Sequence, residues 1–233
     1  VPSFRQDLKT PIDLVEEVAR IYGYGKIPQT LPAAKPSAAG VSQREVSCLI
    51  KNILSGLGLN EVITYSLVDR NLLGQSGINL DNGIVAIANP LSKEQEVLRP
   101  ALWPSLVRAV AYNLNQQQGQ VSIFEIASIF TGKDTSVEED PLLSIALCGE
   151  RLSFTQNGLT RDELTLLHLK GILETLFNRL GVKSYDLVKQ ENQQINILID
   201  QKPAGWLWEL APQVLRGFDI KNHQVILAQL SLQ

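Results

Sequence analysis

The chain has 233 residues, a formal net charge of -3, and 44% hydrophobic and 19% charged residues. That length can bury one sizeable core, and the composition is ordinary for a globular protein. No apolar run reaches the roughly 20 residues that a transmembrane helix needs, and no signal peptide opens the chain, so we expect no membrane association. The negative charge argues against broad, charge-driven binding of nucleic acid.

Two details of the composition concern the cellular setting. Cys48 and Cys148 lie far apart and form no metal or redox spacing, so we predict two buried thiols in a reducing cytoplasm. The chain contains no methionine and begins at Val1-Pro2. This indicates a piece of a longer polypeptide.

Residues 1–28 are predicted to form a first, helical unit. Thr10 and Pro11 supply an N-cap and a first-turn proline, and Gly23 is placed to end the helix. Apolar residues recur between them at helical spacing, at Leu14, Val15, Val18, Ile21 and Tyr22. The proline- and alanine-rich residues 29–41 that follow are predicted to be a linker.

A second unit, residues 42–233, is predicted to begin with a strong helix. Ser42 and Glu45 form a capping box, and Gly58 is placed to stop the helix. The side chains that we expect this helix to bury are Leu49, Ile50, Ile53 and Leu54.

The rest of the second unit mixes strands and helices. Strands are predicted at 62–68, 84–88, 121–130, 142–148, 194–199, 205–210 and 225–232. Helices are predicted at 102–114 and from a capping box of Thr160 and Glu163 through Leu180, and an acidic loop at 134–140. No internal repeat is visible. This order predicts an α+β fold with a mostly antiparallel sheet flanked by helices.

Few side chains offer chemistry. The histidines are His168, on a predicted apolar-rich helix, and His223, in a loop, and a lone helical histidine is most often structural. No activated nucleophile or glycine-rich phosphate loop is recognisable. Arg99 follows an Asn-Pro turn and can hold a carboxylate or phosphate, but a structural role is the simpler interpretation. Of Trp206 and Trp208, we expect one in the core and the other exposed or at an interface.

Acidic residues gather near the first helix. Asp7 precedes it, and Asp13, Glu16 and Glu17 fall in its first two turns. Carboxylates are the ligands that Mg²⁺ prefers, but acids at a helix start also complement the helix dipole. The pattern alone favours a solvated helix face.

Three long segments carry a resemblance to a known family, the β subunit of bacterial-type phenylalanyl-tRNA synthetase. Residues 4–28, FRQDLKTPIDLVEEVARIYGYGKIP, resemble the end of its B5 domain. Residues 89–115, NPLSKEQEVLRPALWPSLVRAVAYNLN, resemble the start of its core domain, and residues 121–130, VSIFEIASIF, the strand that follows. Their order and spacing also match the family.

The resemblance implies a core like the catalytic domain of a class II synthetase, with residues 1–28 ending the B5 domain and residues 42–233 forming the core. It also implies a cytoplasmic (αβ)₂ enzyme that attaches phenylalanine to tRNA(Phe). In this family the α subunit holds the active site and uses ATP, whereas the β core is a degenerate copy.

Particular residues agree with degeneracy. A working motif 2 has an arginine just after its first strand to hold the ATP α-phosphate, but Thr131 and Gly132 follow Phe130 here. The final strand, residues 225–230, lacks the glycines of motif 3. Motif 3 also leads into a helix that supplies a second arginine, which is missing here. Loss of both arginines removes the positive charge that stabilises phosphoryl transfer. We therefore expect a non-catalytic core, with an active ATP-dependent carboxylate-activating paralogue or a nucleic-acid-binding module as alternatives.

The resemblance further implies a Mg²⁺ site shared with the α subunit, for which Asp7, Asp13, Glu16 and Glu17 are the matching residues. This reverses the preference that the pattern alone gave. One departure from the family is that Trp208 and Ala211 stand where a glycine and a histidine are usual. The loop geometry near Gly205 is therefore left open.

Overall fold

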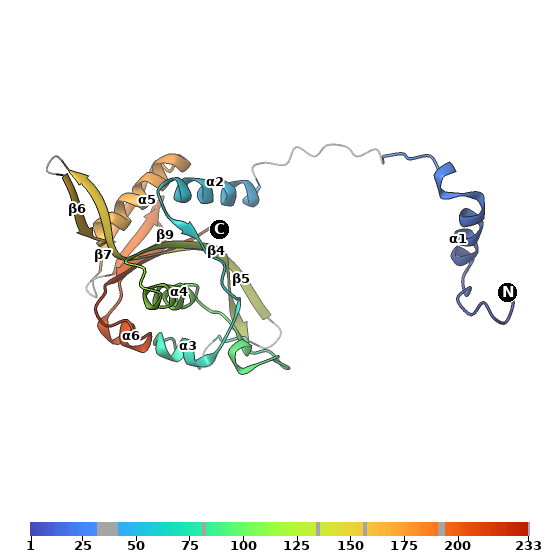
Figure 1. Ribbon diagram of the computed structural model, residues 1–233, viewed down its shortest axis with the longest axis horizontal. Helices are drawn as coiled ribbons and strands as arrows, with labels where there is room; N and C mark the ends of the chain where they lie inside the picture. The colour runs from blue at the N-terminus through green and yellow to red at the C-terminus, as the bar shows by residue number, and fades with distance from the viewer. Residues whose placement is uncertain (32–41, 81–82, 134–135, 156–157, 191–193, 233) are drawn as a thin grey trace. The chain divides into compact units, whose positions relative to one another are not determined.

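The computed structural model describes residues 1–31, 42–80, 83–133, 136–155, 158–190 and 194–232 (Figure 1). It divides into two compact units, Val1–Gly40 and Val41–Gln233. The first contains the helix α1 (Pro11–Tyr22) and the short 3₁₀ helix η1 (Tyr24–Lys26), with Thr10 and Gly23 as the predicted caps. Most of the predicted linker, residues 32–41, lies outside the described residues. Across the described part of the chain, no helix is long and apolar enough to cross a membrane.

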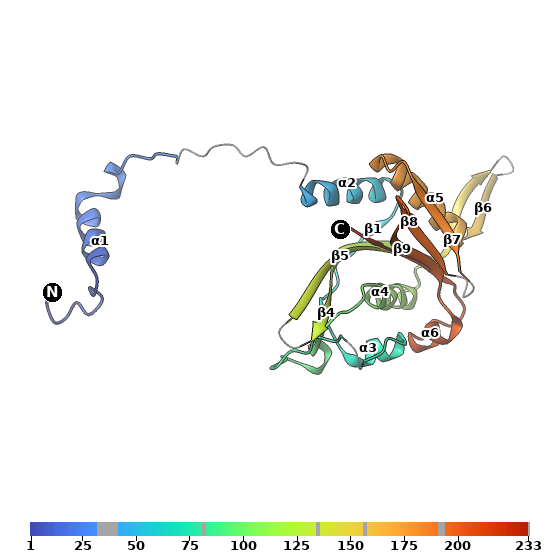
Figure 2. The same cartoon turned by 180° about the vertical axis from the view of Figure 1, so that it is seen from behind.

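The second unit is organised by one sheet, which has eight strands over the described residues. The strands are β1 (Asn60–Glu61), β4 (Gln120–Lys133), β5 (Ser136–Thr155), β6 (Gly158–Glu163), β7 (Tyr185–Lys189), β8 (Ile195–Ile199), β9 (Lys202–Glu209) and β10 (Val225–Ser231). Their order is β1-β4-β5-β10-β9-β8-β7, and β6 pairs with the far end of β5 as an arm (Figures 1 and 2). β1 is parallel to β4 and the other pairings are antiparallel.

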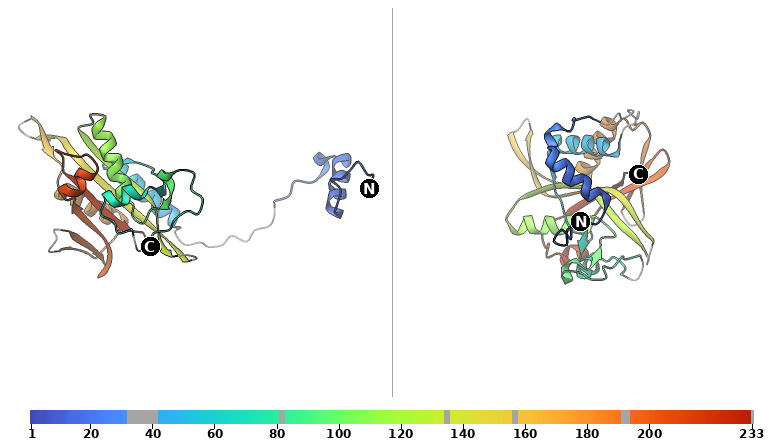
Figure 3. Two further views of the ribbon diagram at one scale, coloured as in Figure 1. Left: turned by 90° about the horizontal axis from the view of Figure 1, so that it is seen from below. Right: turned by 90° about the vertical axis from the view of Figure 1, so that its right-hand side faces the viewer.

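Helices cover both faces of this sheet, and Figure 3 shows the division from two further directions. On one face lie α2 (Gln43–Gly56) and α5 (Leu166–Leu180). On the other lies α4 (Trp103–Asn115), beside the short helices α3 (Arg70–Gln75) and α6 (Pro212–Gly217) (Figure 1). A small second sheet pairs β2 (Leu67–Val68) with β3 (Val97–Leu98), next to the 3₁₀ helix η2 (Lys93–Gln95).

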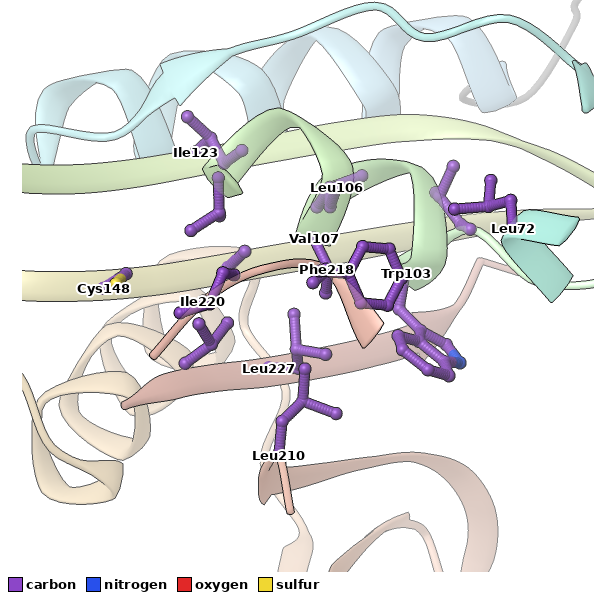
Figure 4. Close-up of a cluster of buried hydrophobic side chains, with 14 of the residues drawn as sticks. Leu72, Trp103, Leu106, Val107, Ile123, Cys148, Leu210, Phe218, Ile220 and Leu227 are labelled. Carbon is purple, nitrogen blue, oxygen red and sulfur yellow. The ribbon is translucent and has the colours of Figure 1, made fainter. Parts of the chain in front are cut away.

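Alternation along the strands explains why two cores form. On β4, Ile123 faces α4 and its neighbour Phe124 faces α2 and α5, because successive side chains of a strand point to opposite faces. On this side α4 contributes apolar side chains that recur at helical spacing, namely Trp103, Leu106, Val107 and Val110. Figure 4 shows Trp103, Leu106 and Val107 in the same cluster as Cys148 of β5 and Leu227 of β10.

Most predicted elements are confirmed, including the capping box of α2. The oxygen of Ser42 accepts from the Glu45 amide at 3.3 Å, and the Glu45 carboxylate accepts from the Ser42 amide at 2.8 Å. The helix predicted at 102–114 and the long strands around 121–130, 142–148, 194–199, 205–210 and 225–232 are also present.

Two local predictions are wrong. Thr160 and Glu163 lie in β6, where Thr160 pairs with Ser153, and α5 starts instead at the cap Thr165. Within the predicted acidic loop, residues 136–140 extend β5, because pairing with the long β4 outweighs the low strand propensity of acids; residues 134–135 lie outside the described residues.

The strands predicted at 62–68 and 84–88 are shorter than expected. Between β1 and β2 the chain is extended, but the Thr64 amide donates to the Glu125 carboxylate at 3.0 Å rather than to a neighbouring strand. The second stretch forms an isolated bridge between Ala86 and Val97.

Several burial predictions also need correction. Ile50 and Leu54 are buried, but Ile53 is half-buried and Leu49 is 47% exposed, because α2 rests on the sheet and α5 along a narrow stripe. Cys148 is buried, whereas Cys48 is exposed.

The two neighbouring tryptophans of β9 also differ from the prediction. Trp206 and Trp208 are both half-buried on the α4 side, since residues two apart on a strand share a face. Their ring centroids lie 3.5 Å apart, and Trp208 meets Trp103 edge-on at 5.6 Å.

A buried ion pair crosses the α4 side of the sheet. Arg99 and Glu125 each expose only 2% of their side chains, and Arg99 Nη1 lies 3.3 Å from Glu125 Oε1. The Thr64 hydroxyl donates to Glu125 Oε2 at 2.7 Å and accepts from Arg99 Nη1 at 2.9 Å. Arg99 Nε donates to the Ser128 carbonyl at 2.9 Å. Every charge in this network is therefore matched by hydrogen bonds.

The stripe on α2 can be tested by truncation. Leu54→Ala should cost about 2–5 kcal/mol of unfolding free energy because it leaves a cavity in a full core. Leu49→Ala, on the exposed side of the same helix, is the matched control and should cost less than about 1 kcal/mol. Urea denaturation of both variants measures this, and equal losses would contradict the placement of α2.

The buried ion pair predicts a strongly asymmetric result. Arg99→Met leaves the Glu125 carboxylate buried without a counter-charge and should cost about 3–5 kcal/mol. Arg99→Met combined with Glu125→Leu removes both charges and should recover much of that loss. The single variant Glu125→Leu completes the comparison. If the losses of unfolding free energy in the two single variants simply added up in the double variant, the two residues would not be coupled.

The two thiols should differ in reactivity. Burial raises the pKa of the Cys148 thiol to about 12, and Glu163 adds a smaller contribution. Because the thiolate is the nucleophile, Cys148 should resist a disulfide reagent at about pH 8, while the exposed Cys48 reacts. Cys48→Ser should abolish labelling until denaturant is added. Labelling of folded Cys48→Ser would contradict the burial of Cys148.

Candidate functional site

The acidic residues of the first unit were the predicted metal ligands, and Asp13 has a structural task there. Its Oδ2 accepts hydrogen bonds from the Lys9 amide at 2.8 Å, the Thr10 amide at 2.7 Å and the Thr10 hydroxyl at 2.9 Å. The two amides and the hydroxyl hold the pKa of the Asp13 carboxyl below its usual range, with the Thr10 amide as the largest cause. Asp13 thus caps the start of α1.

Asp7 and Glu17 are brought together, but by an arginine. Arg5 Nη2 lies 2.7 Å from Asp7 Oδ2 and 2.5 Å from Glu17 Oε1, and Arg20 approaches Glu17 Oε2 at 2.6 Å. The Arg5 hydrogen bond is the main cause that lowers the pKa of both carboxyls, and Arg20 adds to it at Glu17. Sequence reasoning did not foresee Arg5, although its position two residues before Asp7 gives it reach.

Glu16 differs from the other three acids. It is exposed and has no hydrogen-bond or ion-pair partner among the described residues. Within those residues no three histidine, cysteine or acidic side chains are close enough to hold a metal ion. Of the four carboxylates, Asp7, Asp13 and Glu17 thus already accept hydrogen bonds from within the first unit.

The second candidate region is the sheet face at the end of β4, where Thr131 and Gly132 follow Phe130. Thr131 pairs with Glu138, and Gly132 with Val137, at the outer end of the β4–β5 hairpin. By alternation Thr131 lies on the α4 side, as Ile123 and Ile129 do. A shallow hollow of about 650 Å³ lies here, lined by Ile129, Glu138, Glu139, Asp140, Leu142, Gln229 and Ser231.

The charge of this hollow is the reverse of what a nucleotide needs. Its charged lining residues are Glu138, Glu139 and Asp140, and carboxylates repel the phosphates of ATP. The nearby cation Arg99 is buried and already engaged by Glu125 and the Ser128 carbonyl. Arg99 thus has the structural role that the sequence favoured. Its partner Glu125 was missed, although an acid inside the apolar run FEIAS was a signal of a buried pair.

Of the two histidines, only His168 has a structural role in the described residues. His168 Nδ1 accepts from the Thr165 amide at 3.0 Å, so this nitrogen completes the cap of α5. His223 is exposed in the loop before β10.

The stretch around Gly205, where the sequence departs from the family, lies within β9, and its pairing with β8 shifts register between Ile197 and Leu198. Gly205 pairs with Leu230 on one side and Ile197 on the other. A Cβ there would lie 2.0 Å from the Gln229 carbonyl oxygen, so the close approach of β10 requires glycine. Ala211, at the position where the family usually has histidine, is the N-cap of α6.

Comparisons with known proteins agree with this architecture. A likeness to the pyrrolysyl-tRNA synthetase of Desulfitobacterium hafniense has a TM-score of 0.65 at 13% identity, covering 82% of this chain and 67% of that one. At this identity the likeness concerns the fold alone. It confirms the predicted class II synthetase-like α+β fold.

Sequence relatives are more specific. The phenylalanine–tRNA ligase beta subunit of Dehalococcoides mccartyi (strain CBDB1) is 32% identical over 223 residues, which are 93% of this chain and 28% of the relative. That of Fusobacterium nucleatum subsp. nucleatum is 32% identical over 242 residues, 99% of this chain and 30% of the relative. The chain thus spans less than a third of these relatives.

Two family models cover almost the whole chain. The tRNA synthetase B5 domain matches residues 1–24, and the phenylalanyl tRNA synthetase beta chain CLM domain matches residues 27–232. The second match covers far more than half of the sequence and includes every strand of the sheet. The chain belongs to the family of the phenylalanyl-tRNA synthetase beta chain.

Proposed function

We propose that this chain is the non-catalytic, synthetase-like core of the β subunit of a phenylalanine–tRNA ligase. The observation that carries the proposal is the outer end of the β4–β5 hairpin. There Thr131 and Gly132 stand where a motif 2 arginine would bind phosphate, and the adjoining hollow is lined by Glu138, Glu139 and Asp140.

The packing of the α4 side supports the same conclusion. A reacting face must leave room for a nucleotide and an amino acid, but here α4 lies on the sheet and buries Leu106 and Val110 against it. Farther along the same face, the tilted rings of Trp206 and Trp208 contact each other over β9. The buried cation on this side, Arg99, is neutralised by Glu125.

The role that remains is structural. We propose that the core scaffolds a catalytic α subunit in an (αβ)₂ assembly in the cytoplasm, and helps to place tRNA(Phe) while the α subunit uses ATP. We also propose that residues 1–28 are the end of a B5 domain and residues 29–41 a linker to the core at 42–233. The B5 match at residues 1–24 and the separate first unit support this division.

The alternatives find less support. An active carboxylate-activating paralogue would need a free cation on the α4 side, where the described charged residues of the hollow are acidic. A module that binds nucleic acid by charge would be basic, whereas this chain carries a net charge of -3.

We also retain magnesium as a proposal, in a restricted form. Glu16 is free to meet a metal ion completed by oxygens of the α subunit, and Asp13 can contribute an oxygen while it caps α1. Asp7 and Glu17 become ligands only if Arg5 moves away from them. When bound, the ion would supply a bridge between subunits rather than chemistry.

The absence of catalysis is tested by ATP–pyrophosphate exchange with phenylalanine. The chain alone should give no exchange above a heat-denatured sample, whereas the assembled enzyme with its α subunit should be active. Thr131→Ala is a matched control, since it alters this face but would not alter a contaminating enzyme. Phenylalanine-dependent exchange by the chain alone that Thr131→Ala reduces would overturn the proposal.

The magnesium proposal makes a prediction about Arg5. Arg5→Gln releases Asp7 and one oxygen of Glu17, whose other oxygen stays paired with Arg20, and should tighten Mg²⁺ binding by the assembled enzyme several-fold, because these oxygens lose a competing cation. Glu16→Gln should weaken it, and Lys9→Gln is the control, because among the described residues the Lys9 side chain forms no ion pair with these acids. Calorimetric titration with MgCl₂ measures all three. Equal Mg²⁺ affinities for Arg5→Gln, Glu16→Gln and the unaltered enzyme would contradict the proposal. The acids would then be a solvated face of the helix.

A further inference from the structure

We draw no further inference here: the strongest candidate, the groove of about 500 Å³ between α4 and the extended segment 63–68, rimmed by the exposed side chains of Ile63, Tyr65 and Tyr112, is an unpartnered apolar surface, and nothing in the structure shows what covers it.

Discussion

The buried pair of Arg99 and Glu125 fixes how the connecting segments meet the central sheet. Glu125 lies in the middle of β4, and a carboxylate with 2% exposure is tolerable only beside a counter-charge with its other oxygen satisfied. Arg99 and Thr64 meet both needs, so the segments that carry them are drawn against β4. The backbone follows, because the Arg99 amide donates to the Ser66 carbonyl and the Phe130 amide donates to the Arg99 carbonyl, both at 2.9 Å. With Thr64 held inward, its neighbours Ile63 and Tyr65 point outward and are 89% and 78% exposed.

Local patterns in the sequence were sufficient for much of this fold. α4 and α2 were predictable because proline, a capping box and apolar spacing all agree, and the β4–β5 hairpin because two long alternating stretches follow each other. What could not be read locally depends on distant partners. Thr160 with Glu163 has the form of a cap, but residues 158–163 gain more by pairing with β5. Thr64 has a high strand propensity, but its amide donates a hydrogen bond to the side chain of Glu125, 61 residues away in the sequence.

The candidate site shows the same limit. The absence of an arginine after Phe130 is visible in the sequence, but the acidic lining beside Thr131 depends on the register that places Glu138 opposite it. The acids near the first helix are visible in the sequence, but their partner Arg5 changes what Asp7 and Glu17 can bind. In both places the sequence identified the residue types. The ligands that each region can bind depend on residues that only the fold brings close, Glu138 in one region and Arg5 in the other.

The central claim is that the α4 side of the sheet is a packed core rather than a substrate cleft. Trp103, Trp206 and Trp208 are the three tryptophans of the chain and all pack on this side, so their fluorescence reports directly on that face. The measurement is the emission spectrum of the chain during titration with Mg·ATP and phenylalanine, corrected for absorption by the nucleotide. The account predicts an unchanged spectrum. A saturable change in emission that requires both substrates would contradict it.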